Sequence, residues 1–284
     1  MSRLQEIEKE MKGMGAMVEM SSVFEGIASM KIARIKNQVL QATQFFDDLW
    51  AIYTQIRVDS LFRFGRTTSS EQVTDKELYI IITAEGGFSG DIDQKLVRFM
   101  LETYKPENQD IIVIGHHGAV QLAQKNIEFK KYFKLPNNDQ NINVAPIIKY
   151  VQQYKNASVY YQEYVSLMTQ DVKRIELSNA VNNIGSKSDK TEDYISEDTY
   201  IFEPSTYVLV DHLERSMMQI ALEQLILDSK LAQYASRFRA MSASHQAADD
   251  QFSEAKLRYN RARRGIKDER LKEIINGIKK AGLA

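Results

Sequence analysis

Apolar residues recur along the last third of the chain in alternating steps of four and three. The positions are Leu213, Met217, Ile220, Gln224, Leu227, Leu231, Tyr234, Phe238, Met241, His245, Ala248, Phe252, Ala255, Tyr259, Ala262 and Ile266. A sustained period of 3.5 residues is typical of a helix that supercoils against a partner. No glycine or proline interrupts residues 206–263, so the pattern predicts one uninterrupted helix of roughly 90 Å. His245 is expected to be a packed core histidine of this seam.

A second seam starts near the N-terminus. It opens at Leu4, Ile7, Met11, Met14 and Val18, and after an inferred slip in register it resumes at Phe24 and continues to Ile56. Gly13, Gly15 and Gly26 interrupt it, each costing on the order of 1 kcal/mol relative to alanine, so packing must hold this helix. Pairing both seams in an antiparallel two-stranded coiled coil buries them most simply.

The middle of the chain has a different pattern. Short β-branched runs at 78–82 and 111–114 are each followed by a glycine-containing turn and a helical pattern. Two such units in succession predict a parallel sheet built from βαβ connections. Residues 158–165 and 172–177 are expected to be further strands, and the polar segment 185–199 a loop.

These patterns predict an α/β fold in which a long antiparallel coiled coil of the terminal helices joins a central Rossmann-like α/β domain. We expect an N-terminal coiled-coil helix at 1–60, the globular domain at 75–200 and a C-terminal coiled-coil helix at 205–284. The C-terminal helix would be longer than its partner, about 74 residues against about 55 at 1.5 Å each. Its surplus end needs cover from other subunits.

Composition narrows the function. The net charge is −1 and cysteine is absent, which excludes disulfides and thiolate chemistry and fits a reducing compartment. The charged N-terminus does not resemble a secretory signal, and no apolar run reaches the roughly 20 residues that span a bilayer. We expect a soluble, cytoplasmic protein, so the sequon at 156–158 carries no weight.

Two features of the middle segment could carry chemistry. The turn EGGFSG at 85–90 lies where phosphates often bind, but it matches no established phosphate-binding motif, and a tight βα turn explains it. His116 and His117 are adjacent and should point apart, with no acidic or cysteine partner at metal-binding spacing. We therefore expect no cofactor, no metal and no catalytic residue.

The C-terminal end combines charge with an apolar stripe. Residues 256–284 contain ten Lys or Arg against three acidic residues, a net charge of +7 in a chain that is acidic elsewhere. Leu271, Ile274, Ile275 and Ile278 continue the apolar spacing beyond the partner helix. This combination favours docking onto an acidic protein surface. Nucleic acid is not expected as a partner, because Tyr259 alone offers no stacking platform.

Several stretches resemble the gamma subunit of F-type ATP synthases. ASRFRAMSA at 235–243, LRYNRARR at 257–264 and LKEIING at 271–277 resemble its C-terminal helix, and IASMKIAR at 27–34 its N-terminal helix. ITAEGGFSG at 82–90 is similar to the family's TSDRGLCGG turn, GHHG at 115–118 to its GxKG turn, and YIFEPS at 200–205 to its entry into the last helix. Differences lie at residues 15–20, at Ser89 and at Arg264.

The resemblance implies a rotor shaft without catalytic residues, which turns inside three alpha and three beta subunits and couples their catalytic sites to a membrane ring. The implied partners are alpha, beta, epsilon and the c-subunit ring, on the cytoplasmic side of the cell membrane. Contacts with beta are implied for Phe24, Lys31, Arg34, Arg263, Arg264 and Asp268. An apolar bearing is implied for Leu271, Ile274 and Ile275, and contacts with the c ring for Tyr200 and Glu203.

Three other functions remain open. The chain could be the shaft of a specialised rotary ATPase that is not coupled to ion transport. A free-standing coiled-coil scaffold would have helices that end together, which the predicted overhang disfavours. A Rossmann-like enzyme would need a phosphate loop and a paired acid or base, and the middle segment contains neither.

Overall fold

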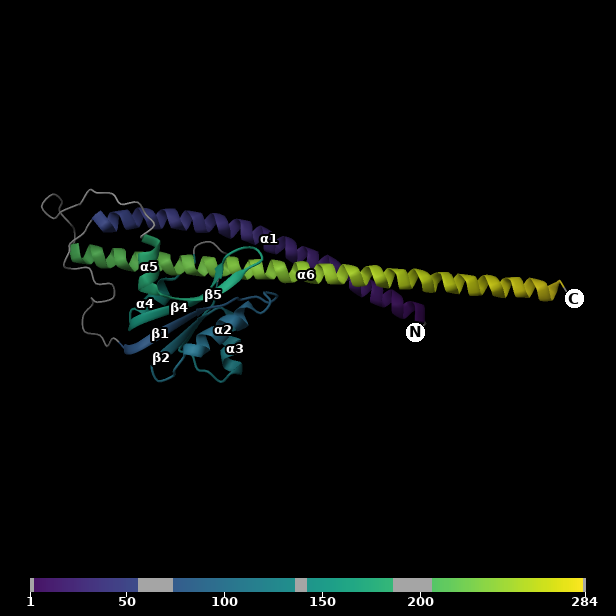
Figure 1. Ribbon diagram of the computed structural model, residues 1–284, viewed down its shortest axis with the longest axis horizontal. Helices are drawn as coiled ribbons and strands as arrows, with labels where there is room; N and C mark the ends of the chain where they lie inside the picture. The colour runs from purple at the N-terminus through teal and green to yellow at the C-terminus, as the bar shows by residue number, and fades with distance from the viewer. Residues whose placement is uncertain (1–2, 56–73, 136–141, 186–205, 283–284) are drawn as a thin grey trace. The chain divides into compact units, whose positions relative to one another are not determined.

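The computed structural model describes residues 3–55, 74–135, 142–185 and 206–282. Two long helices, α1 (Arg3–Gln55) and α6 (Thr206–Ala281), are the first and the last element along the sequence (Figure 1). Between them lie β1 (Thr74–Ile82), α2 (Ile92–Thr103), β2 (Gln109–Ile114), α3 (His116–Gln124), β3 (Lys131–Phe133), α4 (Ala145–Val151), β4 (Tyr154–Tyr164), β5 (Gln170–Glu176) and α5 (Leu177–Gly185).

The strands of the described part form one sheet in the order β3-β2-β1-β4-β5. β1 pairs in parallel with both β2 and β4, so that Ile80 lies opposite Ile112 on one side and Val159 on the other. The predicted βαβ arrangement is therefore confirmed. The edge strand β5 runs antiparallel to β4, because the short turn between them can reverse the chain but cannot hold a crossover.

Helices cover both faces of the sheet. On one face, Tyr79, Ile81 and Val113 pack with α2 and α3, while alternate residues such as Ile80 and Ile112 face α6. Because successive side chains point to opposite faces and both faces are covered by helices, the central strands are apolar throughout. The sheet thus lies between α2 and α3 on one face and α6, together with α4 and α5, on the other.

Some element boundaries differ from the predictions. α3 begins at His116, inside the segment predicted as a turn, because Gly115 adopts a positive φ of 99° and ends the strand abruptly. Leu177 begins α5 instead of ending a strand. The predicted loop at 185–199 lies outside the described residues from position 186 onward.

Contacts divide the chain into two compact units, Met1–Ile27 with Phe238–Ala284 and Ala28–Arg237. Both long helices contribute to both units. In the larger unit, which we call the sheet unit, Ile35 and Phe46 of α1 are fully buried and pack in clusters with Leu227 and Met217 of α6. Gln224 Nε2 donates a 3.1 Å hydrogen bond to Thr43 Oγ1 across the same pair of helices.

The smaller unit, which we call the helical unit, contains only α1 and α6. Arg258 Nη2 lies 3.0 Å from Glu10 Oε1, and His245 Nδ1 lies 3.6 Å from Glu25 Oε2. Residue numbers rise on one helix as they fall on the other, which confirms antiparallel pairing. The backbone of α1 lies close to α6 at Gly15, where an added Cβ would lie 3.2 Å from the Phe252 ring.

The predicted slip in the α1 seam is wrong. Ser21 is buried and Glu25 faces His245, so steps of three and four continue from Val18 through Ser21, Glu25 and Ala28. Because Ser21 and Glu25 are polar, the apolar positions alone did not reveal that the heptad repeat of α1 continues. His245 is also not a packed core residue, because about 37% of its side chain is exposed and it pairs with a carboxylate.

The predicted fold class is confirmed: terminal helices flank a central sheet with helices on both faces. The boundaries 1–60, 75–200 and 205–284 stay a prediction, and the contacts divide the chain differently. In the described part, no helix is long and apolar enough to cross a membrane.

Candidate functional site

The C-terminal segment of α6 within the helical unit exposes an apolar stripe. Every residue from 263 to 281 is exposed, including Leu271, Ile274 and Ile275, whose exposed fractions are 57%, 59% and 43%. Ile278 is 67% exposed. Four large apolar side chains in heptad spacing on a single helix form a surface that needs a partner. We call residues 263–281 the tip.

Charged residues accompany this stripe. Arg263, Arg264 and Asp268 lie on the tip and are exposed. On α1, Arg34 is exposed and Phe24 is half-buried. The predicted contacts of these residues with a beta subunit stay predictions. Tyr200 and Glu203, predicted to contact a membrane ring, lie outside the described residues.

Lys31 has a different setting within the sheet unit. Its side chain is half-buried, and Nζ lies 5.9 Å from the centre of the Tyr234 ring on α6. Arg237 lies over the same ring at 5.1 Å. An ammonium or guanidinium near an aromatic face is attracted by the ring quadrupole. Lys31 therefore lies beside α6, and its predicted contact with a beta subunit stays a prediction.

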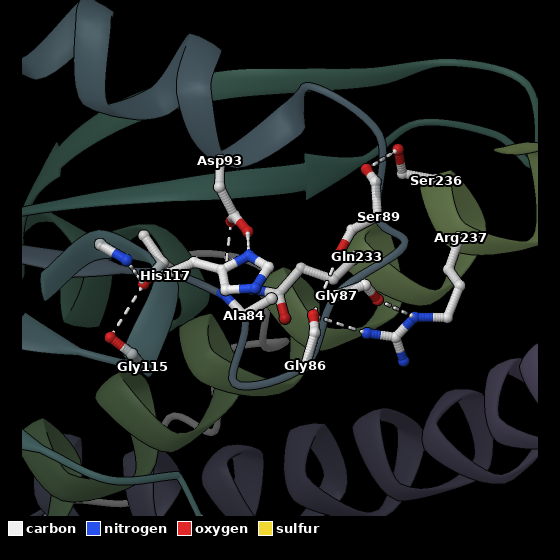
Figure 2. A network of polar contacts seen from close by, with 12 residues as sticks. Ala84, Gly86, Gly87, Ser89, Asp93, Gly115, His117, Gln233, Ser236 and Arg237 are labelled. Carbon is white, nitrogen blue, oxygen red and sulfur yellow. Dashed lines mark hydrogen bonds and ion pairs between the residues drawn. The ribbon is translucent and has the colours of Figure 1, made fainter. Parts of the chain in front are cut away.

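A buried polar network connects the sheet to α6 (Figure 2). Its centre is Asp93 at the start of α2, which is only 3% exposed. The carboxylate accepts hydrogen bonds from the Ala84 backbone N–H at 3.2 Å and from Gln162 Nε2 at 2.8 Å. His117 Nδ1 lies 3.0 Å from its second oxygen. A buried carboxylate is tolerated because these groups surround it.

Side chains of α6 complete the network. Ser229 Oγ donates to Gln162 Oε1, and Gln233 Nε2 lies 3.3 Å from the same oxygen. Ser236 Oγ donates to the Ser89 carbonyl at 2.7 Å. These bonds attach α6 to the sheet in a defined rotational and axial position, which apolar packing alone specifies less sharply.

Arg237 holds the glycine-rich turn that follows β1. Its Nε and Nη2 donate to the carbonyls of Gly87 and Gly86, both at 3.0 Å (Figure 2). Arg237 and Ser236 thus satisfy backbone carbonyls that no strand or helix would pair. The turn predicted at 85–90 is present, and α6 fixes its conformation.

The second glycine turn is shaped by close contact with Thr83. A Cβ on Gly115 would lie 2.0 Å from the Thr83 carbonyl oxygen, and a Cβ on Gly118 2.7 Å from Thr83 Oγ1. Gly118 N–H also donates to Thr83 Oγ1 at 2.9 Å. Only glycine fits both positions, and their spacing directs His117 toward Asp93.

The Asp93 carboxylate raises the pKa of His117 above its ordinary value of 6.5, chiefly by hydrogen bonding. Burial and the charge of Arg237 oppose this shift. The raised pKa indicates that the protonated imidazolium is favoured beside the carboxylate. The pair is a structural clamp that joins the start of α3 to the start of α2.

Sequence reasoning missed this network. We expected no acidic or cysteine residue at metal-binding spacing from the two histidines, and the sequence spacing gave no sign that Asp93, 24 positions away, contacts His117. A signal was present on α6, where Ser229, Gln233 and Ser236 repeat a polar residue at helical spacing beside the apolar seam. Among the described residues, no group of three His, Cys, Asp or Glu is placed to hold a metal ion.

Comparison with known families identifies the class of this chain. A family model described as ATP synthase matches residues 3–280. The chain therefore belongs to the ATP synthase family.

Relatives with curated names narrow the class to one subunit. The chain is 23% identical over 291 residues to the ATP synthase gamma chain of Mycoplasmoides gallisepticum, covering 99% of this chain and 100% of that one. It is 24% identical to the gamma chain of Geobacter metallireducens, covering 98% of both. The resemblance to a gamma subunit, in a divergent form, is therefore confirmed.

Solved structures show the same fold. A chain from the Euglena gracilis mitochondrial ATP synthase structure of OSCP, F1 and c-ring superposes with a TM-score of 0.62 at 16% identity, covering 97% of this chain and 94% of that one. A chain of the Tetrahymena thermophila central stalk and c-ring gives a TM-score of 0.55 at 17% identity, covering 79% and 98%. At these identities the likeness establishes the architecture.

Proposed function

We propose that this chain is the gamma subunit, and hence the central rotor shaft, of a rotary ATP synthase or ATPase. The exposed apolar tip carries the proposal, because a stripe of large aliphatic side chains on a lone helix requires a surrounding surface. The resemblance to the gamma subunit implies that this surface is a ring of alpha and beta subunits, three of each. Leu271, Ile274 and Ile275 would turn within it as a bearing.

Charged residues would transmit force between the shaft and the catalytic subunits. Arg263, Arg264 and Asp268 on the tip are proposed contacts of beta, together with Phe24, Lys31 and Arg34 on α1. The tip contains seven Lys or Arg residues against three acidic residues, and this net positive charge would complement acidic surfaces of the surrounding ring. Catalysis would belong to the ring, and the pair of His117 with Asp93 would serve the structure of the sheet unit.

The sheet unit would connect the shaft to the rest of the rotor. Epsilon and the c-subunit ring are the proposed partners, with Tyr200 and Glu203 as contacts to the ring. The buried network around Asp93 would keep the sheet from slipping on α6 when torque passes between them. The assembled complex would be peripheral to the cytoplasmic side of a cell membrane through that ring.

The first test is the composition of the complex. The tagged chain, isolated from its own cells and analysed by native mass spectrometry, should carry three alpha-like and three beta-like subunits per copy. A homodimer, or the chain alone, would contradict the rotor proposal.

The second test addresses the tip. Arg263→Glu combined with Arg264→Glu should slow ATP-driven rotation several-fold without preventing folding, because both side chains are exposed. The matched control is Lys125→Glu combined with Lys149→Glu, which makes the same charge change on exposed positions of the sheet unit. Equal rotation rates in both double variants would refute the proposed docking role of the two arginines. Unchanged torque after deletion of the residues from Leu271 onward would refute the proposed bearing.

A further inference from the structure

The ring of His117 lies at the junction of α2, α3 and the turn after β1 (Figure 2). Its Nδ1 is 3.0 Å from Asp93 Oδ2, and the backbone N–H of the same histidine donates to the Ala84 carbonyl at 3.0 Å. Asp93 is buried, whereas 31% of the His117 side chain is exposed. The carboxylate is therefore shielded from water, while the ring can exchange a proton with the solvent.

Charged groups from three segments act on the charge of this ring. Asp93 on α2 and Glu85 in the turn after β1 favour the imidazolium, and Arg237 on α6 opposes it. With the ring protonated, two cations balance two carboxylates in this set. Loss of the proton leaves two carboxylates and one guanidinium, and no cation of the described part then contacts the buried Asp93 carboxylate. A buried carboxylate without a paired charge is costly.

Gln162 connects the Asp93 carboxylate to α6. Its Nε2 donates to Asp93 Oδ1 at 2.8 Å, and its Oε1 accepts a hydrogen bond from Ser229 Oγ on α6. Gln162 and Ser229 are fully buried, so water cannot replace either partner unless the network opens. A continuous series of hydrogen bonds therefore runs from the His117 ring through β4 to α6.

The same carboxylate holds the turn after β1. Asp93 Oδ1 accepts a hydrogen bond from the Ala84 backbone N–H at 3.2 Å, immediately before that turn begins. The turn itself is held by Arg237, which donates to the Gly86 and Gly87 carbonyls. We propose that His117 and Asp93 form a pH-sensitive lock: the protonated ring holds the turn after β1 and α6 against the sheet, and loss of the proton loosens both.

The pH at which the lock loosens follows from these charges. The Asp93 carboxylate raises the pKa of His117 above its ordinary value of 6.5, chiefly through their hydrogen bond. The lock is therefore fully closed below about pH 6.5 and loosens as pH rises through the higher folded pKa. The neutral ring can still donate through Nδ1–H, so the contact weakens instead of breaking. Adding charge to a hydrogen bond changes its opening equilibrium by a factor of about five.

The test is hydrogen exchange of the Ala84 backbone N–H in the full chain, measured by NMR spectroscopy from about pH 6 to about pH 9. After correction for the intrinsic pH dependence of exchange, the protection factor should fall about fivefold. This fall should coincide with the titration of the His117 ring in the same spectra. A protection factor that stays constant while the ring titrates would overturn the proposal.

Substitutions at the two adjacent histidines assign the effect to one ring. His117→Gln supplies a neutral donor and His117→Lys a cation that stays charged over this pH range, so neither variant should show the fall in protection. His116→Gln removes the exposed neighbouring histidine and is the matched control, which should keep the fall. A fall that persists in His117→Gln, or that disappears in His116→Gln, would place the pH dependence elsewhere and contradict the lock.

The link to α6 has its own readout. The Nε2 protons of Gln162 should exchange faster over the same pH range, because Asp93 accepts one of them. Unchanged exchange at Gln162 beside a response at Ala84 would confine the effect to the junction of α2 and α3 and refute the link to α6. All these measurements use the isolated chain, so they can fail while the rotor proposal holds, and the reverse.

Discussion

Replacing Gly115 with alanine tests whether the close contact between Gly115 and the backbone of Thr83 requires glycine. The φ of Gly115 is +99°, and an added Cβ would lie 2.0 Å from the carbonyl oxygen of Thr83. Real Cβ contacts do not fall below 3.0 Å, so the two strands must separate at this point. Main-chain atoms cannot rotate away as a side chain can, and Thr83 is fully buried.

Two contributions set the size of the effect. The backbone of Gly115, at φ 99° and ψ 144°, is close to a region that glycine alone adopts readily and that costs another residue roughly 1–3 kcal/mol; overpacking a dense interior costs typically about 1–3 kcal/mol. Together they predict that Gly115→Ala lowers the free energy of unfolding by about 2–6 kcal/mol. At about 2–4 °C per kcal/mol for chains of roughly this size, the thermal midpoint should fall by about 4–24 °C.

The assay is thermal and urea unfolding of the full chain, followed by circular dichroism. The control is Gly87→Ala, because Gly87 is exposed and an added Cβ meets nothing within 4 Å. The free energy of unfolding of this variant should differ from that of the parent by no more than about 0.5 kcal/mol. Gly118→Ala should lie between the two, since its Cβ would meet the Thr83 side chain at 2.7 Å. A midpoint for Gly115→Ala equal to that of Gly87→Ala would show that this turn does not need glycine.

Three further predictions concern the two units. The pair of His117 with Asp93 raises the pKa of the histidine, so its stabilisation is full below about pH 6.5 and is lost as pH rises through the higher folded pKa; urea midpoints across this range should converge for the parent and His117→Gln at high pH. Phe46→Ala, at a fully buried position, should cost about 3–5 kcal/mol in chemical unfolding, and a cost below 1 kcal/mol would contradict its packing. Glu25→Leu combined with His245→Leu should raise the thermal midpoint by replacing a polar seam pair with apolar contacts, whereas a lower midpoint would show that the pair contributes net stability.

Much of the fold could be read from the chain because its signals are local. The seam from Leu213 to Ile266 predicts α6, and burial of Met217, Leu227 and Ala255 agrees with it. The strands at 78–82 and 111–114 were recognised from continuous β-branched runs, which only a sheet covered on both faces requires. Periodicity and composition are properties of neighbouring residues, so the chain determines them before any tertiary contact forms.

The tertiary structure decided what depends on distant partners. Ser21 and Glu25 hid the heptad of α1, and only the position of His245 on the other helix shows that the register continues. Similarly, His117 gained an acidic partner from α2, and residues of α6 closed a turn that follows β1. Long-range electrostatic and hydrogen-bonded contacts carry no local period. The sequence therefore determined the helices, the strands and the family resemblance, while the polar clamp came from folding, which brings separate segments within bonding distance.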